Sequence, residues 1–213
     1  MIEGKKIVVT GGAGFIGSHL CEALATGNEV TSLDNYSTGN ITNHVPGVKY
    51  VEGDTSHIAD LIPDVPDLIF HLGEYSRVEQ SFSDIELVLE SNKVGTFAVL
   101  EFCRKYACKL VYAGSSTKFG DGGLGRSQSP YGWTKASNTE LVINYGSWFG
   151  LTYAITYFYN VYGPREIRTG KYATLRALFT EKMRRGEPLG VVSPGTQRRN
   201  FTFIGDVVDA LMR

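Results

Sequence analysis

The sequence predicts a doubly wound α/β fold, in which helices cover both faces of a parallel sheet. Short β-branched and apolar segments recur along the chain, and longer segments with apolar residues at helical spacing lie between them. Strands that alternate with helices in this way form parallel sheets, because the crossover between two parallel strands is usually a helix. No internal repeat interrupts the alternation.

Composition sets limits on size and on partners. The chain has 213 residues, of which 42% are hydrophobic and 20% are charged, enough for one sizeable core and a small appended lobe. The formal net charge is -1 and no Lys or Arg run dominates a segment, so we expect neither nucleic acid nor a membrane surface as partner. The basic group of Lys182, Arg184 and Arg185 is typical of a solvated helix end.

Three cysteines bear on metal binding and on location. Cys21, Cys103 and Cys108 are odd in number and lack metal-type spacing, so no metal site is expected. No signal peptide or long apolar stretch is evident. These features favour a reducing, cytoplasmic setting with free thiols, and the helical patterns around Cys21 and Cys103 place both in the core.

The first strand, residues 7–9, leads into a glycine-rich turn and then into a helical pattern. Gly11 permits the tight turn, Gly14 lets backbone N–H groups approach a pyrophosphate, and Gly17 lets the helix pack closely on its strand. The helix N-terminus then faces the phosphates. The sequence therefore predicts a dinucleotide site at this turn.

An acidic residue follows the second strand, residues 29–33. Asp34 is placed to accept hydrogen bonds from a ribose diol, and its carboxylate would repel a 2′-phosphate, so NAD is favoured over NADP. The polar loop 35–40 is expected to wrap the adenosine. A third strand, Val48–Glu52, precedes Asp54, which is expected either at the edge of the adenine pocket or as the N-cap of a turn.

The remaining elements complete the sheet. Residues 67–72 form an apolar fourth strand that ends at Gly73, near the ligand crevice. The patterns further predict a long helix over 83–106, a fifth strand over 109–113, a Gly- and Ser-rich loop over 120–129, a helix over Pro130–Phe149 and a sixth strand over 154–159.

A catalytic set is predicted in the second half of the chain. Tyr131 and Lys135 are four residues apart on one helix, so their side chains emerge on the same face. An ammonium beside a phenol lowers the phenol's pKa from about 10 towards neutrality, which makes tyrosine a usable general acid and base. Ser115, at the carboxyl end of the preceding strand, is placed to hydrogen-bond the same substrate oxygen. The three residues form a site for moving a proton off an alcohol while its carbon gives hydride to NAD.

With these residues in place, the chain resembles the extended short-chain dehydrogenase/reductases, in particular the NAD-dependent nucleotide-sugar epimerases and dehydratases of Rossmann fold. The resemblance runs along the whole chain. It is carried by residues 10–18, 34–35, 53–54, 71–72, Asn92 with 95–96, 115–120, 131–135, 160–164, 199–201 and 206–210.

The resemblance implies roles for single residues. In that family the tyrosine and lysine positions hold the catalytic base and its ribose-binding helper, which are Tyr131 and Lys135 here, with Ser115 as the third member. The family's asparagine and arginine that hold the substrate's nucleotide diphosphate correspond to Asn160 and Arg199. The expected cofactor contacts are Gly11, Gly14, Phe15, Ile16, Gly17, Asp34, Asn35, Ser37, Thr38, Gly39, Asp54, Thr55, Leu72, Gly73, Asn92, Tyr131, Lys135 and Tyr159.

Departures from the family pattern indicate which of the family's reactions is expected. The resembling 4,6-dehydratases carry Asp-Glu after the catalytic residue and decarboxylating members keep the Glu, whereas this chain has Ser116 and Thr117. Oxidation and re-reduction at C4 needs no such acid, so C4 epimerisation of a nucleotide sugar, most simply a UDP-hexose, fits best. A reductase or dehydrogenase of the same family is the alternative. Glu74 stands where the family usually has a small residue, and Asn200 replaces a common Asp.

Family members run about 100 residues further than this chain, and they use that segment to finish the sugar-nucleotide lobe. We therefore expect an NAD-binding domain over residues 1–165, a partial substrate lobe over 166–200 and a truncated return segment over 201–213. An NAD-binding module without turnover is the alternative that this length raises.

Two helices predict self-association. The helices expected at 83–106 and Pro130–Phe149 carry more apolar residues than one sheet face covers, and a purely intrachain core is the alternative. Pairing with symmetry mates would form the four-helix interface that the resembling family uses, so a homodimer is expected. The residues taken as examples are Val88, Leu100, Leu141, Ile143 and Trp148.

Overall fold

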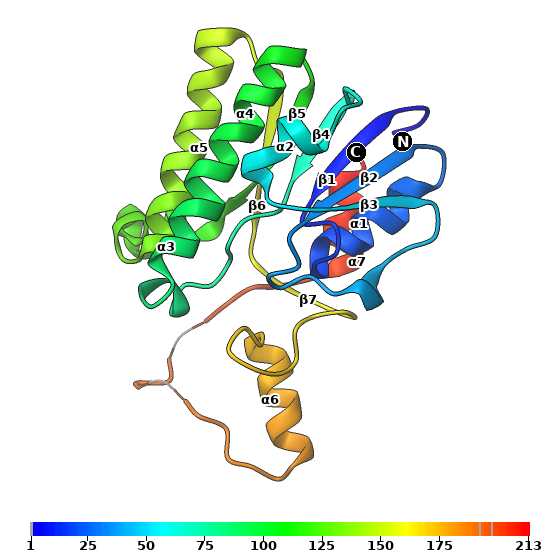
Figure 1. Cartoon of the computed structure of the whole chain (residues 1–213). Helices are drawn as coiled ribbons and strands as arrows, with labels where there is room; N and C mark the ends of the chain where they lie inside the picture. Colours follow the sequence, from blue (N-terminus) through cyan, green and yellow to red (C-terminus); the bar gives the residue numbers. More distant parts are fainter. Residues whose placement is uncertain (1, 192, 197) are drawn as a thin grey trace.

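The computed structural model describes residues 2–191, 193–196 and 198–213. Six parallel strands form the main sheet in the order β3-β2-β1-β4-β5-β6 (Figure 1). Their bounds are β1 Lys6–Thr10, β2 Glu29–Asp34, β3 Val48–Glu52, β4 Leu68–His71, β5 Lys109–Ser115 and β6 Tyr153–Phe158. The strand order reverses direction between β1 and β4, which is where open α/β sheets leave a ligand crevice. The doubly wound α/β fold is confirmed.

Helices cover both faces of this sheet. Helices α1 (Phe15–Ala25) and α7 (Ile204–Leu211) lie together on one side, and α4 (Gly95–Tyr106) and α5 (Pro130–Phe149) stand side by side on the other, with the short α2 (Ile58–Leu61) (Figure 1). Successive residues of β1 alternate between the two cores: Ile7 and Val9 pack under α1 and α7, while Val8 packs under α2 and α4. Burial of both faces explains why the strands are continuously apolar.

Several connections differ from the sequence patterns. The helix expected over 83–106 begins at Ile85 and consists of α3 (Ile85–Val88), a π-helical turn η4 (Leu89–Val94) and α4. The expected loop after β5 is a 3-10 segment, η5 (Ser116–Ser127). Short 3-10 turns also occur at η1 (Ile41–Asn43), η2 (Thr55–His57) and η3 (Gln80–Phe82). The helix Pro130–Phe149 is confirmed, with Ser129 accepting a hydrogen bond from Gly132 N as its N-cap.

Two residues expected on an outer apolar face lie in the interior. Val88 and Leu100 are both 0% exposed and belong to the chain's own core, so their assignment to an outer apolar face is wrong. Val88 ends α3, before the π turn, and Leu100 lies on α4, after it; the extra residue of the π turn rotates the faces of α4 relative to those of α3. Ile143 and Trp148 on α5 are exposed, and so is Phe97 on α4, which the sequence analysis did not single out.

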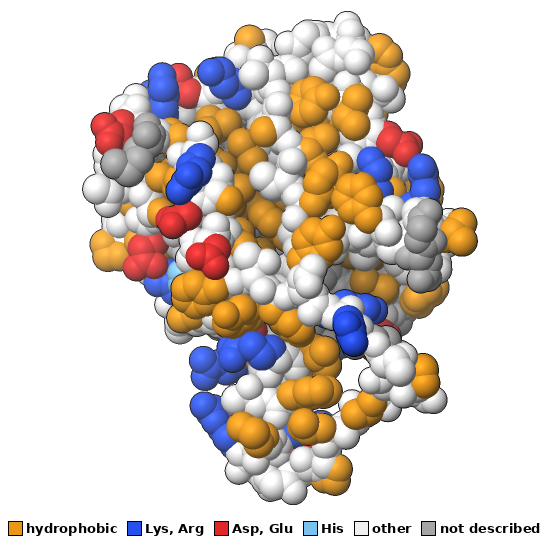
Figure 2. Space-filling model, turned by 180° about the vertical axis from the view of Figure 1, so that it is seen from behind, with side chains coloured by type: hydrophobic (Ala, Val, Ile, Leu, Met, Phe, Trp, Pro, Cys, Tyr) orange, Lys and Arg blue, Asp and Glu red, His pale blue; other side chains and the backbone are white. Residues whose placement is uncertain are grey.

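A small segment lies apart from the sheet. It holds α6 (Leu175–Arg184) and is joined to the main body by β7 (Asn160–Tyr162) and β8 (Phe201–Phe203), a parallel pair (Figure 1). Seen from behind, hydrophobic side chains gather on its surface (Figure 2). They include the exposed Leu175, Leu178 and Met183, while Ala177 is the buried residue of α6.

The cysteines and the helices complete the description. Cys21, Cys103 and Cys108 are free and buried, so the placement of the first two in the core is confirmed. Within the described residues, no helix is long and apolar enough to cross a membrane.

Gly17→Ala should destabilise the fold, because the added Cβ would collide with the backbone carbonyl of Gly11. We expect a loss of about 2 kcal/mol or more in the free energy of unfolding, measured by chemical denaturation, despite alanine's better helix propensity. Gly190→Ala is the matched control, since no atom lies within 4 Å of its Cβ position. Equal stability of the two variants would contradict the close packing of α1 on the turn.

Candidate active site

The carboxyl ends of the strands open into a cleft of about 500 Å3. It is lined by the glycine turn, the ends of β2, β4, β5 and β6, the start of α5 and the segment that precedes α6. This volume is typical of a site for a cofactor or small ligand. The position agrees with the rule that ligands bind where the strand order reverses.

The glycine turn leaves room for phosphates. Gly11 has φ +73, and a Cβ there would come 2.9 Å from Gly73 Cα, so the turn and the end of β4 approach more closely than any side chain permits. Gly14 occupies the N-cap of α1 and has no side chain, so no side-chain hydrogen bond caps the helix. The first backbone N–H groups of α1 are thus available to an anion at the cleft.

Asp34 closes the ribose end of the cleft. Its carboxylate is nearly buried and accepts hydrogen bonds from Ala13 N at 2.9 Å and Tyr36 N at 2.8 Å. Burial raises the pKa of Asp34, and the amides of Tyr36 and Ala13 oppose this rise. Gly39 packs directly on Asp34, where a Cβ would lie 2.7 Å from Oδ1. The turn therefore holds the carboxylate in one orientation at the edge of the cleft.

Polar residues form the wall of the cleft next to Asp34, where the adenine side is expected. Asn35, Ser37, Thr38, Asp54 and Thr55 all line the cleft. Asp54 stands at the N-cap position of η2, yet its side chain makes no cap hydrogen bond and instead accepts from Asn35 Nδ2 at 2.6 Å. Of the two expectations for Asp54, the structure thus favours the pocket edge over the side-chain cap.

Ser115 and Tyr131 meet inside the cleft. The Tyr131 hydroxyl donates to Ser115 Oγ at 3.1 Å, and Ser115 Oγ also accepts from Thr117 Oγ1 at 2.9 Å. Ser115 is the last residue of β5, and Tyr131 lies in the first turn of α5. Two hydroxyl groups at this distance form a site for the oxygen of a substrate alcohol.

Lys135 emerges one turn after Tyr131 on the same face of α5 and also lines the cleft. Its side chain is 6% exposed, and its ammonium group pairs with the Glu74 carboxylate and donates to the Ala113 carbonyl oxygen. Nζ lies 4.7 Å from the centre of the Tyr112 ring. Ser115, Tyr131 and Lys135 are thus brought together as expected.

Glu74 is a functional candidate whose role the sequence analysis left open. Its side chain is 3% exposed, and besides Lys135 it accepts hydrogen bonds from Thr96 Oγ1 at 2.8 Å, Asn138 Nδ2 at 2.9 Å and the Tyr112 hydroxyl at 3.2 Å. Burial by itself would raise the pKa of Glu74, but the charge of Lys135 and the hydrogen bonds from Lys135 and Thr96 hold it below its ordinary value. The sequence signal was a carboxylate directly after the glycine that ends a buried strand.

Other expected residues lie around the cleft or away from it. Phe15, Ile16, Leu72, Tyr159 and Asn160 line it. Gly39 lies behind Asp34, and Asn92 is buried, where it accepts from Tyr75 N at 2.7 Å and donates to Thr134 Oγ1 at 3.1 Å. Arg199 does not line the cleft and donates to the Arg198 carbonyl.

Two arginines that the sequence did not mark as site residues, Arg77 and Arg176, also line the cleft. Arg77 donates through Nε and Nη2 to the Tyr172 carbonyl at 2.9 Å and 2.7 Å, and burial lowers its pKa. Arg176, on α6, pairs with the buried Glu166. No motif marks either residue, because their places depend on how the segment before α6 folds back over the cleft.

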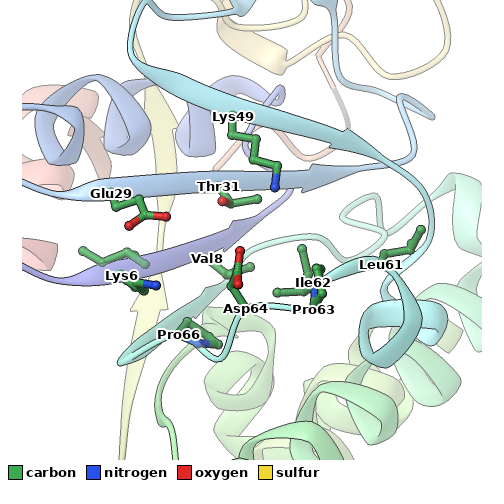
Figure 3. Close-up of a pocket in the computed structure, with 11 residues that line it drawn as sticks. Lys6, Val8, Glu29, Thr31, Lys49, Leu61, Ile62, Pro63, Asp64 and Pro66 are labelled. Atoms are coloured by element: carbon green, nitrogen blue, oxygen red, sulfur yellow. The ribbon is translucent and has the colours of Figure 1, made fainter.

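A second, much smaller pocket lies near the amino ends of the strands (Figure 3). Its volume of about 20 Å3 holds no more than a water molecule. Lys6, Glu29, Lys49 and Asp64 are labelled around it, together with apolar residues of the α2 connection (Figure 3). Its size and its distance from the carboxyl ends of the strands separate it from the site described above.

Comparison with known proteins agrees with this geometry. Residues 7–213 match the model of the NAD dependent epimerase/dehydratase family. A UDP-N-acetyl-alpha-D-glucosaminuronate decarboxylase of Bacillus cytotoxicus is 31% identical over 97% of this chain and 70% of its own length. The chain thus spans about 70% of this relative.

Solved structures show the same fold. The UDP-glucose 4-epimerase of Thermus thermophilus, in complex with NAD, superposes with a TM-score of 0.83 at 31% identity, covering 97% of this chain and 73% of that one. The UDP-N-acetylglucosamine 4-epimerase of Methanobrevibacter ruminantium gives a TM-score of 0.86 at 27% identity, covering 99% and 73%.

The fold and the cleft define a dinucleotide-dependent enzyme of the Rossmann class. By the extent of the match and the identity to its relatives, the chain belongs to the NAD-dependent epimerase/dehydratase family, whose members act on nucleotide sugars as epimerases, decarboxylases and related enzymes.

Asp34 should set the choice of cofactor. We expect the protein to bind NAD at least about tenfold more tightly than NADP, ~1.4 kcal/mol, because the buried carboxylate at the cleft edge repels a 2′-phosphate. Asp34→Asn should reduce the preference for NAD, measured as the ratio of the NADP and NAD dissociation constants in calorimetric titrations. Asp60→Asn, a change at an exposed carboxylate on α2, is the control. Equal affinity of the unchanged protein for both cofactors would refute the repulsion argument.

Proposed function

We propose that this protein is an NAD-dependent C4 epimerase of a nucleotide sugar, with a UDP-hexose as substrate, acting by hydride transfer to and from bound NAD. The hydrogen bond of 3.1 Å between Tyr131 and Ser115, in a cleft shared with the glycine turn and Asp34, carries the proposal. The nucleotide-sugar 4-epimerases among the solved structures with the same fold support it.

Each member of the site has a distinct task. Ser115 hydrogen-bonds the C4 oxygen of the sugar, and Tyr131 takes the proton from this oxygen and later returns it. NAD, when bound, supplies the hydride acceptor and donor. Lys135 provides positive charge near Tyr131 and a donor for the cofactor ribose. The cofactor is held by the turn of Gly11, Gly14 and Gly17, by Asp34 and by the polar residues of the adenine side.

Two hydroxyl residues argue against elimination and decarboxylation. Ser116 and Thr117 stand where the dehydratases carry an acid pair, and the Thr117 hydroxyl is directed at Ser115 Oγ at 2.9 Å. Without a carboxylic acid at these positions, the chain offers the hydroxyl set that a C4 oxidation and re-reduction requires. UDP-glucuronate should therefore remain unchanged, although relatives include UDP-glucuronic acid decarboxylases.

The substrate side is assigned to the second half of the chain. Residues 1–165 would bind NAD, 166–200 would form part of the substrate lobe, and 201–213 would return to the main body. Asn160, which lines the cleft, is proposed to bind the nucleotide diphosphate, and Arg199 to reach it from the segment before β8. We expect the protein in the cytoplasm, in keeping with its three buried free thiols.

Tyr131→Phe should abolish interconversion of UDP-glucose and UDP-galactose, with a fall in kcat of about 100-fold or more, because the proton acceptor is lost while the ring stays. Chromatography of the sugar nucleotides measures it, with NAD confirmed bound. Tyr153→Phe, a matched change outside the cleft on β6, should keep the rate.

The alternatives give different results in the same assays. Absence of interconversion by the unchanged protein with NAD bound would refute the epimerase proposal. Net consumption of added NADH would instead identify a reductase or dehydrogenase of the family. NAD binding without turnover of any sugar nucleotide would indicate a cofactor-binding module.

We also propose a homodimer through the outer surfaces of α4 and α5. The exposed apolar residues of these two helices include Phe97, Ile143, Trp148 and Phe149, of which Trp148 is 61% exposed. A two-fold axis would make this face self-complementary, and a stable interface should bury more than about 1,000 Å2. The segment that holds α6, which is proposed as part of the substrate lobe, does not cover this face, because it lies beyond the carboxyl ends of the strands (Figure 1).

Light scattering at micromolar concentrations should give about twice the chain mass of 23.4 kDa. Phe97→Asp, which places a charge in the proposed interface, should shift the mass towards the monomer. Met183→Asp is the control, since Met183 is also exposed but lies on α6, apart from α4 and α5 (Figure 1). A monomer mass that persists as the concentration rises would refute the dimer.

A further inference from the structure

Lys135 is held from the protein side by two acceptors. The Glu74 carboxylate and the Ala113 carbonyl oxygen each accept one of its N–H groups. An ammonium group has three N–H groups, so one remains for the cleft that Lys135 lines. With the lysine side chain 6% exposed and the glutamate side chain 3% exposed, this pair is shielded from water.

The orientation of Glu74 is itself fixed. Its Oε1 atom accepts from Thr96, Tyr112 and Asn138, at distances between 2.8 Å and 3.2 Å. These donors come from α4, β5 and α5, so three elements hold one carboxylate oxygen. The other oxygen, Oε2, is left to face Lys135.

We propose that Glu74 is a positioning residue for the reaction: as the buried counter-charge of Lys135, it holds the ammonium group in place and leaves its remaining N–H to face the cleft that Tyr131 also lines. The inference rests on the proposed function, because the position of Lys135 affects turnover only where Tyr131 moves the substrate proton. Glu74 takes no direct part in the proton and hydride transfers proposed for Ser115, Tyr131 and NAD, so this role is an additional one.

Among the titratable groups around Lys135, Glu74 is the one that can act as its counter-charge. A buried ammonium without a counter-charge gives up its proton at lower pH. Glu74 is the carboxylate that contacts Lys135 within the described part of the chain. His71 is neutral, because burial lowers its pKa to about 4, and burial together with Glu74 raises the pKa of Tyr112 well above its ordinary value.

A second lysine lies near Glu74. Lys93, on the π turn, donates to Asn138 Oδ1 at 2.9 Å and to Ser137 Oγ at 3.1 Å. Burial lowers the pKa of Lys93, and the charge of Glu74 opposes this fall, so the same carboxylate acts on both lysines.

Glu74→Gln removes the charge with little change in shape. Without its counter-charge the ammonium group of Lys135 should lose its fixed position, so we expect its ¹⁵N signal to change, as measured by ¹⁵N NMR of the lysine side chains with Lys135→Met for assignment. In the epimerase assay kcat should fall about tenfold while KM changes little, because the geometry beside Tyr131 is altered and not the binding of the substrate. Glu79→Gln, at an exposed carboxylate that follows on the same loop, is the control.

Several results would overturn the inference. An unchanged ¹⁵N signal of Lys135 in Glu74→Gln is one, and this measurement needs no substrate, so it stands apart from failure of the epimerase assay. A further loss of NAD affinity or rate when Glu74→Gln is added to Lys135→Met is another, because a residue that acts through Lys135 has no effect once the lysine is gone.

The variants Glu74→Gln and Lys135→Met also provide a test in case Glu74→Gln fails to fold. If Glu74→Gln does not fold alone, the double variant Glu74→Gln/Lys135→Met, which buries neither charge of the pair, is compared with it. Recovery of the fold in the double variant supports Glu74 as the counter-charge of Lys135. Failure of both overturns the inference, because Glu74 would then serve its three other donors.

Discussion

A continuous chain of hydrogen bonds links Thr10, beside the glycine turn, to Lys135, and the geometry of the cleft depends on it. Thr10 Oγ1 accepts two backbone N–H groups at the end of β4, so its own hydrogen points to His71 Nδ1 at 2.7 Å. The neutral His71 then donates through Nε2 to Thr96 at 3.0 Å, and Thr96 donates to Glu74 at 2.8 Å. Glu74 holds Lys135. Every hydrogen in this chain has one consistent place, which fixes the carboxylate as the final acceptor.

Much of the fold and part of the site followed from local pattern. Strands buried on both faces are apolar throughout, and the glycine turn and Asp34 sit at the carboxyl ends of neighbouring strands by the topology itself. Tyr131 and Lys135 share a helix face because of their spacing, and Ser115 reaches them because β5 ends beside the start of α5. These are short-range rules applied to elements that the sequence marks clearly.

The remainder depends on contacts between distant residues. Glu74 and Lys135 are 61 positions apart, and no periodicity connects a strand-end carboxylate with a lysine on a later helix. No local pattern marks the π turn either, although it sets which face of α4 is buried, with Leu100 inside and Phe97 exposed. Asn92 shows the same limit, since its amide is engaged inside the core by Tyr75 and α5 and does not reach the cleft.

The cleft separates two electrostatic tasks. Backbone N–H groups at the uncapped start of α1 offer the positive end of a helix dipole to a diphosphate, so this binding needs no side-chain cation at the glycine turn. The charge of Lys135 is matched by Glu74 and is therefore not drawn to the phosphates. One N–H group of Lys135 is then left to face the cleft that Tyr131 also lines. A site of this kind depends on the orientation of a buried ion pair more than on its net charge, which is why a carboxylate held by three elements stands behind the lysine.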